Sequence, residues 1–362
     1  MVSSRVSWTS AAPPVALVVL ALSWGRDPGP ALAAVIAVAL GAAVLAAVHH
    51  AEVVAHRVGE PYGSLLLAMA VTVIEVGLIV TLMVSGGPET ATLARDTVFA
   101  AVMITCNGIL GLSLLIGAWH RGLAVFNAEG TGAALATVAT LATLALVLPT
   151  FTTSVPGPEF SAAQLAFAAV ASLAVYVMFV LTQTVRHRDF FLPVAADGTV
   201  LPADEHASPP SQATAMRSLG LLVVALVAVV GLAKVESPVI EDAVAELGFP
   251  QSFVGVVIAL LVLLPETLAA ANAARRGRTQ NSLNLALGSG MASIGLTIPV
   301  IAVATIWLDG PLLLGLGSTQ LVLLAITVVV GVLTVVPGRA TRLQGGVHLI
   351  LFAAFLFLAA SP

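Results

Sequence analysis

The chain has 362 residues, of which 59% are hydrophobic and only 9% are charged. Soluble domains carry about 25% charged residues, so this composition excludes an ordinary soluble protein and predicts a polytopic membrane protein. The formal net charge of −4 says little about partners, because most of the surface faces lipid. The single cysteine, Cys106, lies in an apolar segment, which excludes a disulfide framework and a cysteine-rich metal site.

Eleven apolar segments are candidates for membrane-spanning helices, because a helix needs about 20 apolar residues to cross the hydrocarbon core. In chain order they are 11–24, 31–48, 61–85, 96–118, 131–149, 161–184, 218–234, 249–272, 283–307, 311–335 and 345–360. The first is short and resembles a signal peptide. It lacks a convincing cleavage site and further spans follow at once, so we interpret it as the first membrane helix. The predicted fold is therefore all-α with about eleven spans.

Basic residues are distributed unequally between the two sides that these spans define. Eleven arginines fall on the side of the N-terminus, and only Arg26, Arg95 and Lys234 fall on the other side. Loops rich in lysine and arginine stay in the cytoplasm. We therefore predict a multi-pass protein of the inner (plasma) membrane with a cytoplasmic N-terminus and an external C-terminus.

The eleven spans divide into one helix and two groups of five. The expected regions are a first helix with its loop at 1–30, repeat 1 at 31–185, a cytoplasmic linker without regular structure at 186–217, and repeat 2 at 218–362. With five spans in each repeat, the second copy is inverted relative to the first. Inverted repeats with an ion site near the midplane, at their interface, are a common plan of secondary transporters.

Each predicted repeat carries a lone glutamate in its second span, Glu75 in the first and Glu266 in the second. A charge at the bilayer centre costs roughly 2.5–3.5 kcal/mol on insertion scales and usually marks an ion or proton path. Two carboxylates match the charge of one Ca²⁺, and when the ion leaves, desolvation and mutual repulsion favour protonation. Competition between one Ca²⁺ and about two protons is the chemistry of antiport. The alternative is a pair of neutral glutamates that hydrogen-bond helix to helix.

Several residues near the two glutamates are candidates for cation ligands or for support of the ligands. Thr72 lies three residues before Glu75 and hence on the same helical face. Asn107 and Ser289 occupy similar places in the spans that follow the two glutamates, although close helix packing also explains small residues there. Pro265 removes a backbone hydrogen bond next to Glu266. It predicts either a simple kink or a broken helix whose free carbonyls, near 261–262, bind the cation.

A cluster of titratable residues precedes the span of Glu75, at its predicted cytoplasmic mouth. It contains His49, His50, Glu52, His56 and Glu60. Histidine titrates near physiological pH, so His50, Glu52, His56 and Glu60 are candidates for a proton or cation access path. A zinc site and a water-satisfied interfacial cluster are the alternatives.

The segment HHAEVVAHRVGEPYGSLLLAMAVTVIEVGLI at 49–79 resembles bacterial calcium/proton antiporters of the ChaA type, in the cation/calcium exchanger superfamily. Residues 263–300 are similar to the second signature of that family. The resemblance implies an exchanger that expels calcium, or a monovalent cation, in return for protons. It also implies that Glu75 and Glu266 take the places of the two cation-binding acidic residues.

The sequence departs from that family beside both carboxylates. Many members have Gly-Asn-Ala-Ala-Glu, whereas this chain has Val-Thr-Val-Ile-Glu at 71–75 and Val-Leu-Leu-Pro-Glu at 262–266. The loss of the amide side chains leaves the choice between Ca²⁺ and Na⁺ or K⁺ open.

We therefore predict a secondary active transporter, not an enzyme, that exchanges cytoplasmic Ca²⁺ for external protons through the two glutamates. A Na⁺ or K⁺/proton antiporter is the alternative, and a cation channel is the alternative from another class, although the sequence has no pore signature. There is no glycine-rich phosphate loop, which argues against an ATP-driven pump. The expected partners are inorganic cations and the lipid bilayer, with no nucleic acid, no nucleotide and no cofactor.

Overall fold

The computed structural model describes residues 7–26, 28–59, 62–86, 90–194, 199, 209–307 and 310–362. Within them every predicted span contains a helix. Eight helices are long and apolar enough to cross a membrane, and a bent helix pair makes a ninth. Two shorter apolar helices, Trp8–Ser23 and Met69–Val84, fall in the remaining predicted spans. The prediction of an all-α polytopic membrane protein is confirmed.

The helices form two compact units. Unit 1 comprises Met1–Gly87 and His206–Val254, and unit 2 comprises Pro88–Glu205 and Gly255–Pro362. These units group helices by contact and not by chain order, so the division into two repeats stays a prediction.

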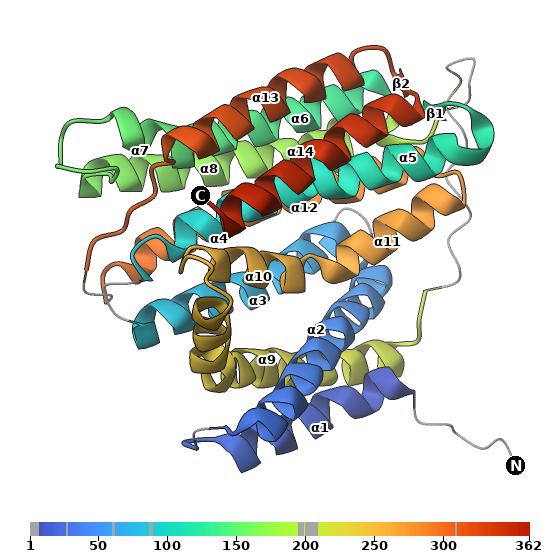
Figure 1. Cartoon of the computed structure of the whole chain (residues 1–362). Coiled ribbons are helices and arrows are strands. Elements are labelled where there is room, and N and C mark those ends of the chain that lie inside the picture. The colour runs from blue at the N-terminus through green and yellow to red at the C-terminus, as the bar shows by residue number, and fades with distance from the viewer. Residues whose placement is uncertain are drawn as a thin grey trace, which may run out of the picture. The chain divides into compact units, whose positions relative to one another are not determined.

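Unit 1 contains four helices: α1 (Trp8–Ser23), α2 (Pro30–Val58), α3 (Tyr62–Gly86) and α9 (Gln212–Glu246). The helices α1, α2 and α9 pack against one another, and α3 packs on α2 and α9 (Figure 1). Small residues allow close approach: a Cβ atom added at Gly77 of α3 would lie 2.7 Å from Cγ2 of Val230 in α9. The pair α3 and α9 is therefore in direct backbone-to-side-chain contact.

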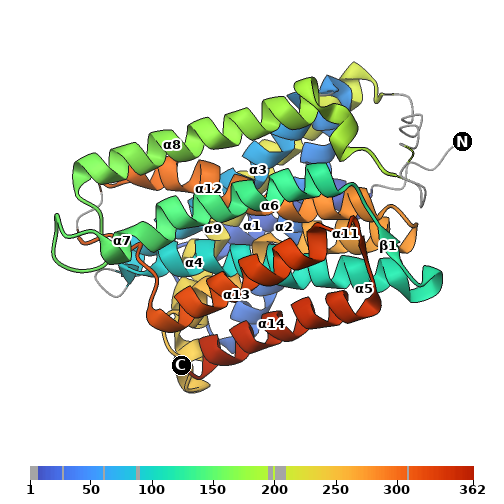
Figure 2. The same ribbon diagram turned by 90° about the horizontal axis from the view of Figure 1, so that it is seen from above.

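Apart from the first two residues of α10, which lie in unit 1, unit 2 contains the remaining described elements. They are α4 (Leu93–Met103), the π-helical turn η2 (Ile104–Ile109), α5 (Leu110–Arg121), β1 (Ala124–Val125), α6 (Ala128–Ala142), the π-helical turn η3 (Thr143–Val147), α7 (Leu148–Phe151), α8 (Ala162–Leu181), the π-helical turn η4 (Thr182–Arg186), the 3-10 helix η5 (Arg188–Phe191), α10 (Phe253–Val262), α11 (Leu264–Arg275), α12 (Thr279–Ala304), α13 (Ser318–Val335), β2 (Arg339–Ala340) and α14 (Arg342–Ala360). The helix α12 contacts α5, α6, α8 and α11, and α13 lies with α6 and α14 (Figure 2). Strands β1 and β2 form a short antiparallel pair.

The predicted linker is ordered at its beginning. Arg188–Phe191 forms a 3-10 helix, and Phe191 is buried against Phe179 of α8, with ring centroids 5.5 Å apart. The amide of Asn284 in α12 donates a hydrogen bond to the Phe191 carbonyl at 2.7 Å. The expectation of a linker without regular structure is wrong for these residues, because a buried aromatic side chain and a partly buried amide fix them to unit 2. It is also wrong for residues 212–217, which form the start of α9.

The span predicted at 311–335 begins later than expected, because the stretch before Ser318 is extended. Its backbone bonds to three other segments of unit 2: Leu313 N to Ala91 O (3.0 Å), Gly315 N to Pro158 O (2.8 Å) and Leu316 N to Leu146 O (2.9 Å). These bonds satisfy the peptide groups without a helix. The stretch is buried in the protein although it is not helical: Leu314 and Leu316 are each 1% exposed.

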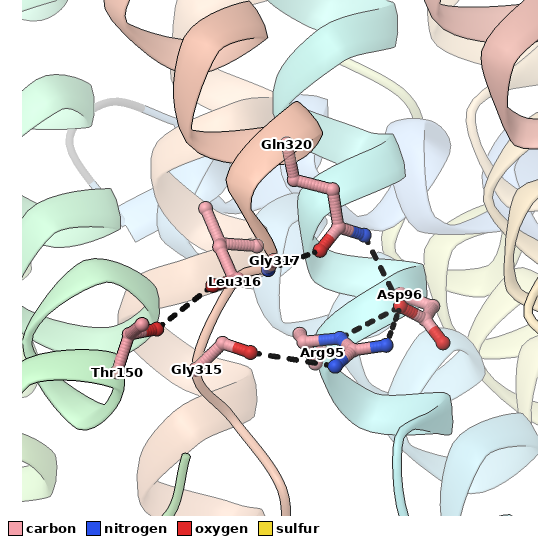
Figure 3. Close-up of polar contacts among 7 residues, drawn as sticks. All are labelled: Arg95, Asp96, Thr150, Gly315, Leu316, Gly317 and Gln320. Atoms are coloured by element: carbon pink, nitrogen blue, oxygen red, sulfur yellow. Dashed lines mark hydrogen bonds and ion pairs between the residues drawn. The ribbon is translucent and has the colours of Figure 1, made fainter. Parts of the chain in front are cut away.

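An ion pair within the first turn of α4 bonds to this extended stretch and to the start of α13 (Figure 3). Arg95 Nε and Nη2 each lie 2.8 Å from Asp96 Oδ1, and Arg95 Nη1 donates to the Gly315 carbonyl at 3.3 Å. Gln320 Nε2 also donates to Asp96 Oδ1 at 3.4 Å, while Gln320 Oε1 accepts the Gly317 N–H at 2.9 Å. The pair thus connects α4 to the start of α13.

We expect Arg95→Gln to destabilise the protein. The Asp96 side chain is only 3% exposed, and removal of one partner from a buried ion pair costs roughly 3–5 kcal/mol because a buried charge remains. Thermal unfolding of the purified protein in detergent checks this, with the exposed Arg276→Gln as the control. The double variant Arg95→Gln/Asp96→Asn should recover most of the loss. A wild-type melting temperature for Arg95→Gln would show that the pair contributes nothing.

Candidate functional site

Glu75 lies in the middle of the continuous helix α3 and is only 4% exposed. Thr72 is 5% exposed, one turn earlier, and its hydroxyl oxygen has no hydrogen-bond partner among the residues that the structure describes. Both side chains therefore belong to the buried face of α3 in unit 1. The two side chains are thus one turn apart on the same buried face, as predicted. A cation could offset the cost of burying the Glu75 carboxylate and the unpaired Thr72 hydroxyl oxygen.

Glu266 has a different backbone setting, because its helix is broken. The helices α10 and α11 meet at a 52° bend, and Leu263 between them has φ −87° and ψ 0°. Pro265 lies in the first turn of α11 together with Glu266. Proline has no N–H, so the Leu261 carbonyl loses the donor that a continuous helix would supply. The structure therefore has a broken helix at this point, and the binding of a cation by the free carbonyls stays a prediction.

The break places the C-terminal end of α10 and the N-terminal end of α11 near Glu266. The C-terminal end of α10 presents carbonyl groups, and the N-terminal end of α11 presents N–H groups. A carboxylate in the first turn of a helix is stabilised by the partial positive charge of that end. Half-buried Glu266 thus lies where backbone carbonyls can join a carboxylate as oxygen ligands.

The two glutamates belong to different units: Glu75 to unit 1 and Glu266 to unit 2. In unit 1 the helix of Glu75, α3, packs on α2 and α9. In unit 2 the helix of Glu266, α11, packs on α5, η2 and α12.

Asn107 and Ser289 lie close to one crossing of helices in unit 2. A Cβ atom added at Gly290 of α12 would lie 2.6 Å from Oγ1 of Thr105 in η2, so the two backbones approach closely there. Ser289 is half-buried beside that crossing. Asn107 is fully buried, and its amide is used within the protein: Nδ2 donates to Thr327 Oγ1 at 2.8 Å, and Oδ1 lies 3.0 Å from Nδ1 of His348.

The histidine cluster at the end of α2 divides in the structure. His50 is 3% exposed, and its ring nitrogens lie 2.9 Å from the Thr9 carbonyl and 3.3 Å from the Ser218 hydroxyl, so it ties α2 to α1 and α9. Glu52 is exposed and His56 is half-buried, while Glu60 lies outside the described residues. Among the described residues no three His, Cys, Asp or Glu side chains form a group that could hold a metal ion.

Sequence reasoning missed the partners of Asn107. His348, Thr327 and Thr334 are each at most 2% exposed and lie on α13 and α14. A histidine inside the apolar last span was a signal, since polar side chains in a membrane helix face the protein interior. Nothing in the sequence indicated which polar residue, more than two hundred positions away, would meet it.

Comparisons with known proteins agree with this architecture. The sequence profile described as Sodium/calcium exchanger protein matches residues 29–185 and 217–360. The chain is 46% identical over 323 residues to the putative ionic transporter y4hA of Sinorhizobium fredii, covering 89% of this chain and 87% of that protein. It is 34% identical over 361 residues to the sodium-potassium/proton antiporter ChaA of Escherichia coli, covering 98% of this chain and 97% of that protein.

Solved structures share the fold. Native YfkE superposes with a TM-score of 0.70 at 16% identity, over 98% of both chains. The H⁺/Ca²⁺ exchanger CAX superposes with a TM-score of 0.68 at 16% identity, over 96% of this chain and 86% of that one. The profile and the 34% identical relative each cover most of the chain. The chain therefore belongs to the sodium/calcium exchanger family, and it is a polytopic membrane antiporter of the cation/calcium exchanger superfamily.

Proposed function

We propose that the protein exchanges a cytoplasmic cation, Ca²⁺ in the first place, for external protons, and that Glu75 and Glu266 are the exchanging carboxylates. The observation that carries the proposal is the setting of the two acids in the structure. Glu75 is 4% exposed in a long apolar helix, and Glu266 occupies the first turn after a helix break. Such sites are costly in a bilayer and mark ion paths.

Calcium is favoured by charge and by ligand chemistry. Two carboxylates neutralise one divalent cation, and Ca²⁺ accepts carboxylate, carbonyl, hydroxyl and water oxygens in groups of six to eight. The Thr72 hydroxyl and the carbonyls at the end of α10, near Leu261, are candidates for further ligands. Asn107, whose amide is bound to Thr327 and His348, and Ser289 support the site from the neighbouring helices.

The repeats and alternating access belong to the same proposal. The two stretches that match the family profile, 29–185 and 217–360, lie within two residues of the proposed repeats. An inverted repeat allows one helical bundle to rock against the other, so that the site opens to each side in turn. In this arrangement His50, Glu52 and His56 would belong to the cytoplasmic access path, and Glu52 is exposed. Glu60, outside the described residues, stays a candidate of the same path.

A Na⁺ or K⁺/proton antiporter is the second candidate, and two observations favour it. The relative with 34% identity over almost the whole chain is a sodium-potassium/proton antiporter by name. The amide side chains beside the glutamates are also missing here: Thr72 and Leu263 stand in their places. Fewer fixed ligands reduce the advantage of a divalent ion.

Ion competition in inverted membrane vesicles decides between the two candidates. A proton gradient is imposed, and Ca²⁺, Na⁺ and K⁺ are added in turn while the gradient is followed with a fluorescent dye. Dissipation by Ca²⁺ is the expected result, with the Glu75→Gln protein as the matched blank. Dissipation of the gradient by Na⁺ or K⁺ but not by Ca²⁺ would show that the substrate is a monovalent cation and not calcium. Dissipation by none of the three ions would contradict cation/proton exchange.

The orientation in the membrane is a separate proposal with its own test. The N-terminus is placed in the cytoplasm and the C-terminus outside, in the inner (plasma) membrane, because eleven of the basic residues fall on one side. Reporter fusions after Arg121 and after Gly157 should therefore report opposite sides, the first cytoplasmic and the second external. The same side for both would mean that helices α6 and α7 do not cross together as one span.

A further inference from the structure

The helix between α4 and α5 contains a rare feature, a π-helical turn at Ile104–Ile109 whose six residues are all buried. At its end the Leu110 N–H bonds to the carbonyls of Thr105 and Asn107. Such a turn inserts an extra residue and is found frequently at functional sites. In unit 2 the turn contacts α11, the helix that carries Glu266, and α11 also packs on α5. The shape of this turn therefore helps to seat α11.

A buried histidine of α14 also contacts the turn. His348 of α14 is 0% exposed, and its Nδ1 lies 3.0 Å from Asn107 Oδ1 while its Nε2 lies 3.1 Å from Thr334 Oγ1. Asn107 Nδ2 donates to Thr327, so Asn107 Oδ1 is the acceptor and His348 Nδ1 carries the hydrogen. His348 Nε2 then accepts the hydrogen of the Thr334 hydroxyl. Both ring nitrogens of a neutral imidazole thus have a side-chain partner, and the Cys106 backbone carbonyl also lies beside the ring.

Close backbone contact places His348 directly against α5, beside the turn. A Cβ atom added at Gly111 of α5 would lie 2.8 Å from the His348 Cβ atom and 3.0 Å from the Gly345 carbonyl. A Cβ atom added at Gly345 would lie 2.6 Å from the backbone nitrogen of Leu115. Small residues of this kind let membrane helices meet at short range, so α14 has little freedom to slide along α5.

We propose that His348 is a positioning residue for cation binding: through its hydrogen bond to Asn107 it fixes the π-helical turn, and the turn fixes α11 and with it Glu266. The inference rests on the proposed function, since it assigns the effect to the affinity of the exchanged cation. In this account His348 acts through its contacts with the turn, which are the hydrogen bond to Asn107 and the backbone carbonyl of Cys106 beside its ring.

Two substitutions of His348 separate its two hydrogen bonds. In His348→Asn the amide takes the place of Nδ1, so the bond to Asn107 is kept and the bond to Thr334 is lost. In His348→Gln the amide reaches toward the place of Nε2, so the bond to Thr334 is kept and the bond to Asn107 is lost. Each variant loses one buried bond, and we expect a similar decrease of the melting temperature in both.

The first readout is the concentration dependence of exchange in vesicles. We expect His348→Gln to raise the half-saturating Ca²⁺ concentration about tenfold, the equivalent of about 1.4 kcal/mol, with a maximal rate close to that of the wild type. His348→Asn should stay within about twofold of the wild-type concentration, the range of an ordinary neutral substitution. A purely structural histidine would instead lower the amount of active protein, and thus the maximal rate, in both variants alike.

The second readout does not depend on transport. Cys106, the single cysteine, lies in the π-helical turn and is 2% exposed, so its reaction with N-ethylmaleimide in detergent reports how often the turn opens. We expect faster labelling in His348→Gln than in His348→Asn.

The two readouts separate the possible failures. Equal half-saturating concentrations and equal labelling rates in the two variants would overturn the proposal, as would a change confined to the maximal rate. A wild-type protein that exchanges no cation, with labelling still faster in His348→Gln, would overturn the proposed function and leave the hold of His348 on the turn intact.

Discussion

Glu75→Gln and Glu266→Gln should each abolish coupled exchange while the protein still inserts and folds. Glutamine resembles the protonated carboxyl group in shape and in hydrogen bonding, so the fold tolerates it. It neither releases a proton nor supplies a negative charge to the cation. A hydrogen bond or contact to a charged group is worth roughly 1.5–3 kcal/mol. Cation affinity should therefore fall by about tenfold to a hundredfold, and proton movement should stop altogether.

The measurement is cation-driven proton flux in liposomes that contain equal amounts of each purified variant. Glu246→Gln is the matched control, since Glu246 is exposed at the end of α9 and lies outside the proposed site. It should transport like the wild type. The two settings differ, so the two losses need not be equal: α3 is continuous at Glu75, whereas α11 begins just before Glu266. Near wild-type flux in either variant would remove that carboxylate from the exchange.

Much of the fold could be predicted from the sequence because hydrophobic length is a strong signal in a membrane protein. A helix satisfies its own backbone groups, and in lipid nothing else can satisfy them, so long apolar runs become helices. The rule that a long apolar run forms a helix failed where other backbone segments of the protein bond to the run. The stretch before Ser318 is apolar but extended, because Ala91, Pro158 and Leu146 bond to its backbone.

The sequence could indicate individual residues of the candidate site, but not how they are arranged or which partners they contact. A lone carboxylate in an apolar span, such as Glu75 or Glu266, can be recognised from the sequence as a candidate functional residue. The reason is that burying its charge in a bilayer costs free energy that a structural role seldom explains. Pro265 indicated an altered helix, but the choice between a kink and a 52° break depends on tertiary contacts. The bond of Asn107 to His348 spans 241 positions, and no local pattern encodes such a pairing.

The apparent affinity for Ca²⁺ should fall steeply as the pH falls, because protons and the cation compete for the same two carboxylates. By mass action each competing proton raises the apparent dissociation constant about tenfold per pH unit, and two protons raise it about a hundredfold. This holds only where the ion-free carboxylates are protonated. At higher pH both have lost their protons, and the affinity should become constant. The sign follows from competition: acid favours the proton-loaded state, and alkali favours the calcium-loaded state.

Equilibrium binding of radioactive calcium to the detergent-solubilised protein across acid and alkaline pH measures this directly, without a gradient or a bilayer. The slope at low pH counts the protons displaced by one Ca²⁺. A limiting slope of two means that the charges balance and that turnover moves no net charge. Replacement of one carboxylate, as in Glu266→Gln, should leave only the slope of the remaining acid. An affinity that does not change with pH would mean that protons and calcium use separate sites, and the two-glutamate mechanism would then be wrong even if both residues are essential.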